Sequence, residues 1–461
     1  MVHIKRAVSM LMVLLSLLGV MICVPQTKAD AAFVVDYDVT CDAVYMVNLD
    51  TDMVVYEKNG HKQKYPASMT KLVTCMITLE YFSDPKSENV TISRDVMTND
   101  TLLKNGVWST GALKEGERID LEALLYCAML PSDNYAALAI AYFVSAEKGD
   151  GTLLWFIDRM NEKAIELGCN DTQFMNPHGL YHEDHYTTAH DMYLLAKNAM
   201  QVPGFANIVS TTVYNRKATN KNDFAETNGK YRLENTNKML STAYEGDGYY
   251  YQYVKGIKTG FIQAAGHTLA TYATRNGYSY ITILMDDGAT KNSEKNYCMI
   301  DAKALYQWAF TSLELKELVS AASPVATVGI DLAWSVDTLD LYPAESFTTL
   351  TLNNVESSSI MVKKNIPDTI TAPVKKGDKL GTADLIYGSE VVGQIELVAG
   401  ETVERSELLY VLSLGSSLFG SPVFIALLAV VSVGIVGYLV FSMLRSRNVG
   451  SVKRVRRYRR M

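Results

Sequence analysis

The chain has 461 residues, of which 48% are hydrophobic and 20% are charged, and its net charge is −7 at pH 7. This length suits two or three domains, and this composition excludes a disordered chain. The acidic balance argues against nucleic acid as a partner, because a polyanion is bound by a surplus of Lys and Arg on a folded face.

The N-terminus has the pattern of a secretory signal peptide. Two basic residues precede an apolar run over residues 7–24, and the small-residue segment 29–32 follows. We predict a signal peptide at residues 1–31, cleaved after Ala31, with an uncleaved anchor helix as the alternative. The body of the protein is therefore expected outside the cytoplasm.

A β-hairpin is predicted next, at residues 43–47 and 53–56. Ser68 and Lys71 then open an apolar segment that predicts a buried helix. Residues three apart share one face of a helix, so the hydroxyl and the amine would lie side by side. Two further Ser-x-x-Lys pairs have this spacing and are expected on the surface: Ser83…Lys86 and Ser145…Lys148.

Helices alternate with loops in the middle of the chain. Apolar spacing predicts helices over residues 120–144, 151–170 and 188–200. The segment Pro131 to Asn134 interrupts the first of them, and a tight turn is expected at Asn176 to Leu180. A loop can present polar side chains for chemistry, which makes the Ser-Asp-Asn triplet of this interruption a candidate site.

Strand-like patterns follow at residues 251–258, 267–274 and 278–285, and a closing helix is predicted over 297–319. Together with the early hairpin, these elements predict one α+β domain over residues 33–312, in which helices flank an antiparallel sheet.

The C-terminal third is predicted to hold a second domain and a membrane anchor. Alternating Val, Thr, Ile and Leu predict a small β-sandwich domain at 320–412, followed by a flexible linker at 413–421. Residues 423–444 carry no charge and are long enough to be a transmembrane helix. The tail at 445–461 has eight basic residues and no acidic one, so the positive-inside rule places it in the cytoplasm and makes the chain a single-pass membrane protein.

Five cysteines remain after the signal peptide: Cys41, Cys75, Cys127, Cys169 and Cys298. Their scattered positions predict buried thiols, with one disulfide left open.

A serine nucleophile needs a base, donors for the oxyanion and a group that holds the substrate. Lys71 is a base for Ser68 when it is neutral, a state that burial or a nearby second cation favours. Lys258 is the candidate second cation. With Thr259 it could bind a carboxylate, while Gly260 keeps the strand edge open to a ligand's backbone.

The interrupted helix supplies the remaining groups. Ser132 could pass a proton between Lys71 and a leaving amine, and Asn134 could hold a substrate amide. Each short motif is common by itself. The order Ser-x-x-Lys, Ser-x-Asn, Lys-Thr-Gly within one secreted domain is far more specific.

These motifs and the sequence around them resemble the D-alanyl-D-alanine carboxypeptidases, which are low-molecular-mass penicillin-binding proteins of the SxxK serine peptidase family. The resemblance covers about residues 33–312 and rests on these blocks: YEKNGHKQKYPASMTKLVT, AMLPSDNYAAL, MNEKAIELGCNDTQFMNPHGL, HYTTAHDM and VKGIKTGFIQAAGHTL. A β domain and a C-terminal membrane attachment also suit the family. We interpret the β domain as a spacer that lifts the active site toward the cell wall.

The resemblance implies that Ser68 forms the acyl-enzyme, Lys71 is its base and Ser132 relays the proton. Backbone N–H groups of Ser68 and Phe261 would form the oxyanion hole. The implied substrates are peptidoglycan stem peptides ending in D-Ala-D-Ala, β-lactam antibiotics would acylate the same serine, and no cofactor is implied.

The resemblance also implies that Lys258 and Thr259 bind the terminal carboxylate. One departure concerns this subsite. The family often has an arginine before the last helix of the domain, and Cys298 occupies that place here. Lys291 and Lys295 are the candidate replacements.

Three other functions are weighed. The histidines His178, His182, His185 and His190 suggest zinc, but their spacing does not match the helical HExxH motif, so a structural or surface role is expected. A class A β-lactamase would need a glutamate that activates water. Glu162 or Glu166 falls in the right interval but is expected to face solvent. The third is a wall-binding protein that has lost catalysis.

Overall fold

The computed structural model describes residue 33 and residues 35–290, 293, 295–354, 356, 359–387, 390–419 and 421–455. The predicted signal peptide at 1–31 and the last six residues of the basic tail lie outside the described residues. The chain divides into two compact units, Met1–Leu313 and Glu314–Met461.

A five-stranded antiparallel sheet organises the first unit, in the order β2-β1-β9-β8-β7. Its strands are β1 (Ala43–Asn48), β2 (Met53–Lys58), β7 (Val254–Ile262), β8 (Gly266–Arg275) and β9 (Tyr278–Met285). The early hairpin joins the late strands through the pairing of β1 with β9, as the sequence predicts. The strand that carries the Lys-Thr-Gly motif, β7, is an edge strand.

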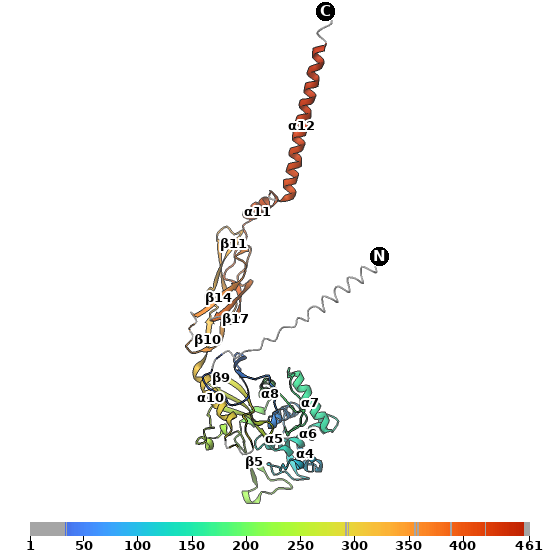
Figure 1. Ribbon diagram of the computed structural model, residues 1–461, viewed down its shortest axis with the longest axis vertical. Helices are drawn as coiled ribbons and strands as arrows, with labels where there is room; N and C mark the ends of the chain where they lie inside the picture. Colours follow the sequence, from blue (N-terminus) through green and yellow to red (C-terminus); the bar gives the residue numbers. More distant parts are fainter. Residues whose placement is uncertain are drawn as a thin grey trace, which may run out of the picture. The chain divides into compact units, whose positions relative to one another are not determined.

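Helices cover both faces of this sheet, which explains why β1 is buried along its whole length. On one face, α10 (Tyr297–Ser312) packs against β8 and β9, where the Tyr306 hydroxyl donates to the Thr271 carbonyl at 2.9 Å. On the other face lie α2 (Thr70–Tyr81) and α8 (Ala189–Gln201). Figure 1 shows the helices α4 to α7 gathered on the side of this unit away from α10.

Helix α2 is the centre of the first unit. All its residues from Thr70 to Leu79 are buried, and it packs against α5 (Leu121–Met129), α6 (Asn134–Lys148) and α7 (Leu153–Glu166) as well as α8. A helix enclosed on all sides is a rigid support for side chains at its N-terminus.

Capping side chains fix where the surrounding helices begin. Each accepts a hydrogen bond from a backbone N–H of the first turn: Asp120 for α5, Asp133 for α6, Thr152 for α7 and Thr188 for α8. The remaining elements of this unit are short: β3 (Asn89–Thr91), α3 (Arg94–Met97), α4 (Asp100–Lys104), β4 (Arg118–Asp120), α9 (Phe205–Ser210), β5 (Val213–Lys217), β6 (Lys230–Glu234) and the 3₁₀ turns η1 (Ala67–Met69), η2 (Ala225–Thr227), η3 (Lys238–Leu240) and η4 (Thr242–Tyr244).

The second unit is a β domain with its own apolar core. A six-stranded sheet has the order β14-β16-β17-β12-β11-β15, and β10 pairs with β13. The strands are β10 (Leu313–Val319), β11 (Ala326–Asp331), β12 (Thr338–Pro343), β13 (Phe347–Leu352), β14 (Ile360–Asn365), β15 (Thr369–Thr371), β16 (Lys379–Tyr387) and β17 (Glu390–Ala399). Leu339, Leu341 and Leu397 lie in its core. The predicted α+β fold with a C-terminal β domain is confirmed.

Two helices end the described chain, α11 (Glu407–Phe419) and α12 (Pro422–Val455). Within α12, Pro422–Arg445 is long and apolar enough to cross a membrane. Helix α11 covers most of the segment 413–421 for which the sequence predicts a flexible linker. In the sequence, Leu414 and Leu418 alternate with the Ser and Gly residues at 413–417, and the helix continues to Phe419.

Three local predictions were wrong. The closing helix ends at Ser312, not at 319, because residues 313–319 pair as β10 with β13, and this tertiary pairing overrides the helix propensity of Leu, Glu and Lys. Strand β7 continues through Gly260 to Ile262, because Gly260 pairs with Thr268 of β8. Ser145 is buried, since its hydroxyl donates to the Thr152 carbonyl at 2.6 Å.

Candidate active site

Ser68 and Lys71 are adjacent at the start of the central helix. Ser68 lies in η1, and Lys71 is in the first turn of α2. Their Oγ and Nζ atoms are 3.0 Å apart, and the lysine is fully buried. The predicted sharing of one helix face is confirmed by this distance.

Lys71 has three polar partners, none of which is a carboxylate. Besides Ser68, its Nζ donates to Asn134 Oδ1 at 2.7 Å and to the His178 carbonyl oxygen at 2.7 Å. Burial, and then the positive charge of Lys258, lower the pKa of Lys71 well below its ordinary value. A neutral amine donates two hydrogens, to the amide and the carbonyl, and its lone pair then faces the Ser68 hydroxyl.

The turn from Asn176 to Leu180 contributes a group that the sequence analysis missed, the His178 carbonyl that orients Lys71. Gly179 has a positive φ of 84°, and a Cβ there would lie 1.9 Å from the Ala67 carbonyl oxygen. Glycine therefore allows this turn to pack against the residue before the nucleophile. The sequence predicted the tight turn, but it could not indicate this contact, because every residue type has a backbone carbonyl.

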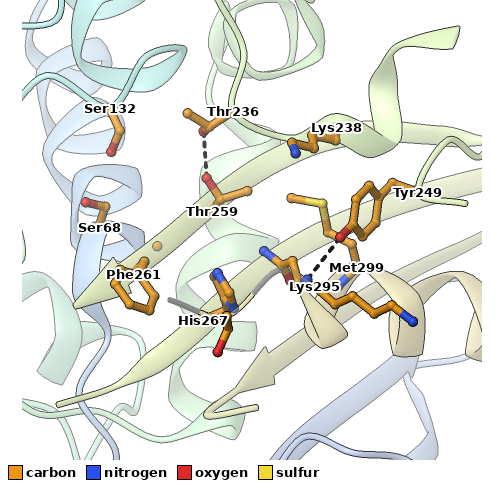
Figure 2. A pocket seen from close by; sticks show the side chains of 13 residues that line it. Ser68, Ser132, Thr236, Lys238, Tyr249, Thr259, Phe261, His267, Lys295 and Met299 are labelled. Carbon is orange, nitrogen blue, oxygen red and sulfur yellow. Dashed lines mark hydrogen bonds between the residues drawn. The ribbon is translucent and has the colours of Figure 1, made fainter. Parts of the chain in front are cut away.

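Ser132 lies between the end of α5 and the start of α6, and its side chain lines the same pocket as Ser68. Its Oγ is buried and has no hydrogen-bond partner among the described residues. Figure 2 shows the hydroxyl of Ser132 directed toward Ser68. The backbone of Ser132 is left-handed (φ 64°), as is that of Ala67 (φ 50°), and such strain is typical of functional sites.

Lys258 is a buried residue of β7, and its Nζ donates to the Thr259 carbonyl at 2.9 Å. Burial lowers the pKa of Lys258 to about 7. The Thr259 side chain lines the pocket, where its hydroxyl lies 2.6 Å from that of Thr236 (Figure 2). Thus Thr259 is placed to contact a ligand. Lys258 does not line the pocket, and it influences the site through its charge, which lowers the pKa of Lys71.

Gly260 brings β7 against the nucleophile. A Cβ at this position would lie 2.8 Å from the Ser68 nitrogen and 2.4 Å from Thr268 Oγ1. Only glycine permits this approach. It sets the backbone of Phe261, the other predicted oxyanion donor, next to Ser68.

These groups surround a pocket of about 390 Å³. Its lining consists of Ser68, Ser132, Thr236, Lys238, Tyr249, Thr259, Gly260, Phe261, His267, Ser293, Lys295, Asn296 and Met299. No described lining residue is acidic. The structure thus brings together all eight predicted site residues. Five of them line the pocket, and the other three, Lys71, Asn134 and Lys258, lie outside its lining.

Cys298 occupies the place where the family often has an arginine, but it does not line the pocket. Its thiol is buried, 3.3 Å from the Cys41 Sγ and 3.2 Å from the His267 carbonyl oxygen. Lys295 lines the pocket, whereas Lys291 lies outside the described residues. All five predicted buried thiols are buried and free.

Two of the four histidines of the zinc alternative, His178 and His185, hold the backbone in place. His185 accepts from the Met175 N–H through Nδ1 and contacts the Thr70 hydroxyl through Nε2, and His178 Nδ1 accepts from the Leu180 N–H. Burial lowers the pKa of both imidazoles. Their ring nitrogens thus serve the turn that supports Lys71.

The glutamates of the β-lactamase alternative face solvent, as predicted. Glu162 and Glu166 are exposed on α7, where both pair with Arg159. Neither lines the pocket, so neither is placed to activate water at Ser68.

Comparisons with known proteins agree with this geometry. Residues 26–289 match the family described as D-alanyl-D-alanine carboxypeptidase, and residues 314–405 match the C-terminal domain of penicillin-binding protein 5. The chain is 28% identical to D-alanyl-D-alanine carboxypeptidase DacF of Bacillus subtilis over 362 residues, covering 78% of this chain and 85% of that protein. It is 26% identical to DacC of Escherichia coli, over 76% of this chain and 81% of that one.

Solved structures are similar as well. D-alanyl-D-alanine carboxypeptidase DacD from Francisella tularensis has the same fold, with a TM-score of 0.62, 22% identity and coverage of 81% of this chain and 95% of that one. The Streptomyces K15 DD-transpeptidase matches with a TM-score of 0.51 and 26% identity, over 60% of this chain and 99% of that one.

Proposed function

The chain belongs to the D-alanyl-D-alanine carboxypeptidase family, and we propose that it removes the terminal D-alanine of peptidoglycan stem peptides through an acyl-enzyme on Ser68. The observation that carries the assignment of residues is the buried Lys71, whose Nζ is 3.0 Å from Ser68 Oγ and has no carboxylate among its three partners. A buried lysine without a counter-ion is a base at neutral pH.

In the first half-reaction, neutral Lys71 takes the proton of Ser68, and Oγ attacks the carbonyl carbon of the penultimate D-alanine. The N–H groups of Ser68 and Phe261 stabilise the oxyanion. The proton returns through Ser132 to the leaving nitrogen, the peptide bond breaks, and D-alanine leaves. The unpartnered hydroxyl of Ser132 supports this route.

In the second half-reaction, water gives a proton to Lys71 and its oxygen attacks the ester. The bond from Ser68 to the acyl group breaks, and Oγ regains its proton. A β-lactam acylates Ser68 in the same way, but its leaving nitrogen stays attached to the acyl group. The adduct is therefore expected to be long-lived.

Asn134 and Thr259 are assigned to substrate binding. The Asn134 amide, already bonded to Lys71, also holds a substrate amide through its NH₂ group, and Thr259 donates its hydroxyl to the terminal carboxylate. Lys258 favours this anion and, through its charge, keeps Lys71 neutral. Gly260 keeps the β7 edge open for the peptide backbone.

Membrane anchoring by α12 belongs to the same proposal. The apolar stretch Pro422–Arg445 and the basic residues after it support a single span with the tail in the cytoplasm and the active site outside. The boundaries proposed are a catalytic domain at 33–312, a β domain at 320–412 that acts as a spacer and is preceded by its strand β10, a span at 423–444 and a tail at 445–461.

The test is D-alanine release by the full-length protein in detergent from a peptide ending in D-Ala-D-Ala. The wild type should release D-alanine, and Ser68→Ala should release none. Ser83→Ala is the matched control, because this exposed serine has the same Ser-x-x-Lys spacing. Absence of release by the wild type would contradict the proposed function.

A further inference from the structure

Asp287, directly after β9, holds the ring of His267, which lines the pocket. The carboxylate side chain of Asp287 is inaccessible to solvent and accepts four N–H groups. Its Oδ1 accepts from the backbone of His267 and Ala289, both at 3.0 Å, and its Oδ2 accepts from His267 Nδ1 at 2.8 Å and Tyr297 N at 3.0 Å.

This environment fixes the orientation of the imidazole. Burial alone would raise the pKa of Asp287, but the hydrogen bonds from His267 and the backbone lower it overall, so the carboxylate is ionised. An ionised carboxylate only accepts, so Nδ1 carries the hydrogen. Nε2 is the ring nitrogen left for a ligand.

The ring faces the part of the pocket where a substrate's end is expected. His267 pairs with Phe261 across β7 and β8, and the two rings are 5.0 Å apart. Its side chain is 19% exposed, and no described residue bonds Nε2. Ser68, Thr259 and His267 line the same cavity, as Figure 2 shows.

The other cations of the pocket are less suited to a carboxylate beside Thr259. Lys238 Nζ lies over the rings of Tyr244 and Tyr249, at 5.1 and 5.4 Å from their centroids. The side chain of Lys295 extends away from Ser68 in Figure 2. Lys258 is a buried residue of β7 that does not line the pocket, and its Nζ donates to the Thr259 carbonyl.

We propose that His267 binds the terminal carboxylate of the substrate through Nε2–H, together with the Thr259 hydroxyl, and that Asp287 is the positioning residue that holds the ring for this contact. The proposal rests on the proposed function and deepens it. In this contact the ring bonds to Asp287 through Nδ1 and to the substrate through Nε2. His267 thereby selects peptides that end in a free carboxylate.

The experiment compares two acyl donors with the full-length protein in detergent. Both are thioesters of the same N-acylated D-alanine. One has a leaving thiol that bears a carboxylate, and in the other this carboxylate is methylated. Release of the thiol gives kcat/KM. His267→Gln should lower kcat/KM for the carboxylate donor by about 10- to 100-fold, the worth of one charge-assisted hydrogen bond, and should change the methylated donor far less.

Controls separate this role from a structural one. His182→Gln is the matched control, since His182 is an exposed histidine beside Asp184 outside the pocket, and it should leave both donors unchanged. His267→Arg should recover part of the loss, because a guanidinium also donates to a carboxylate. Asp287→Asn should cause a smaller loss, seen mainly as a higher KM for the carboxylate donor.

The outcomes are distinct. Equal losses with both donors in His267→Gln, or no loss with either, would overturn the inference. A selective loss in Lys295→Gln but not in His267→Gln would move the role to Lys295. If the wild type cleaves neither donor, the proposed function itself fails. Thermal unfolding identifies a variant that does not fold. If His267→Gln does not fold, the ratio of kcat/KM for the two donors in His267→Arg tests the inference instead.

Discussion

The two sides of the pocket differ in the hydrogen-bond partner that each gives to a basic side chain. On the nucleophile side, formed by Ser68, Lys71, Ser132 and Asn134, the lysine is buried among neutral oxygen atoms. On the carboxylate side, formed by Thr259, His267 and Asp287, the histidine is bonded to a buried carboxylate.

The difference shows how burial assigns a role. A buried cation is costly to keep charged. No carboxylate bonds to Lys71, so burial and the charge of Lys258 lower its pKa by more than the charge of Asp133 raises it, and the amine can accept the serine proton. With a bonded carboxylate, the ring of His267 has a fixed orientation and keeps one nitrogen for an anion. The following variants remove, move or add the features that separate the two sides.

Lys71→Arg should have the largest effect, since it replaces a neutral amine that can accept a proton with a group that is always charged. An arginine stays protonated at every working pH, so acylation by a fluorescent penicillin should slow by ~10³-fold or more. The control is Lys148→Arg, an exposed lysine with the same spacing from a serine, which should label at the wild-type rate. Labelling of Lys71→Arg at that rate would mean that another group is the base.

Gly260→Ala should have the next largest effect, because Gly260 is where β7 meets the nucleophile. The new Cβ would lie 2.8 Å from the Ser68 nitrogen, so strand or nucleophile must move. A displacement of this kind should slow penicillin labelling by ~10²-fold. Gly246→Ala is the control, since a Cβ there meets nothing within 4 Å. Similar rates in the two variants would show that close approach is unnecessary.

Asn134→Asp gives Lys71 the kind of partner that His267 has. The new carboxylate would sit 2.7 Å from Nζ and favour the charged lysine, so the pKa of Lys71 should rise. Acylation requires the neutral amine. Its acid limb should therefore move to higher pH, with a loss of roughly tenfold at pH 7 that is regained as pH increases. The check is the pH profile of penicillin labelling, and a limb that stays in place would contradict this account of Lys71.

Lys258→Met should shift the same profile in the same direction but by less. Burial is the larger cause of the lowered pKa of Lys71, and the charge of Lys258 is the second. Removing that charge raises the pKa of Lys71, so the acid limb should again move to higher pH, with a loss of a few-fold, up to about tenfold, at pH 7. Thermal unfolding serves as the stability control. A shift to lower pH would mean that Lys258 acts in some other way.

The sequence predicted the nucleophile side well because its groups carry local signals. Ser68 and Lys71 share a helix face by spacing, and Ser132 and Asn134 flank a helix start that Pro131 makes visible. Gly260 indicated a strand edge open to a ligand, and β7 is an edge strand. These are properties of residue type and short spacing, which a single chain displays.

On the carboxylate side the sequence predicted Thr259 but missed His267 and Asp287, because the contacts of these two residues are not local. His267 lies at the start of β8, the first strand of the β8–β9 hairpin, and Asp287 follows β9, 20 residues later. The predicted strands 267–274 and 278–285 already placed both residues at one end of that hairpin, which was the available signal. Segment 313–319 was assigned to a helix for a related reason, since its partner β13 lies far along the chain.

The most direct test of the central claim is the mass of the full-length protein after reaction with benzylpenicillin. The account predicts one long-lived adduct per chain, on the peptide that contains Ser68, and no adduct in Ser68→Ala. An adduct on another residue, or penicillin hydrolysed with no lasting adduct, would contradict the assignment of Ser68 as the nucleophile of a carboxypeptidase.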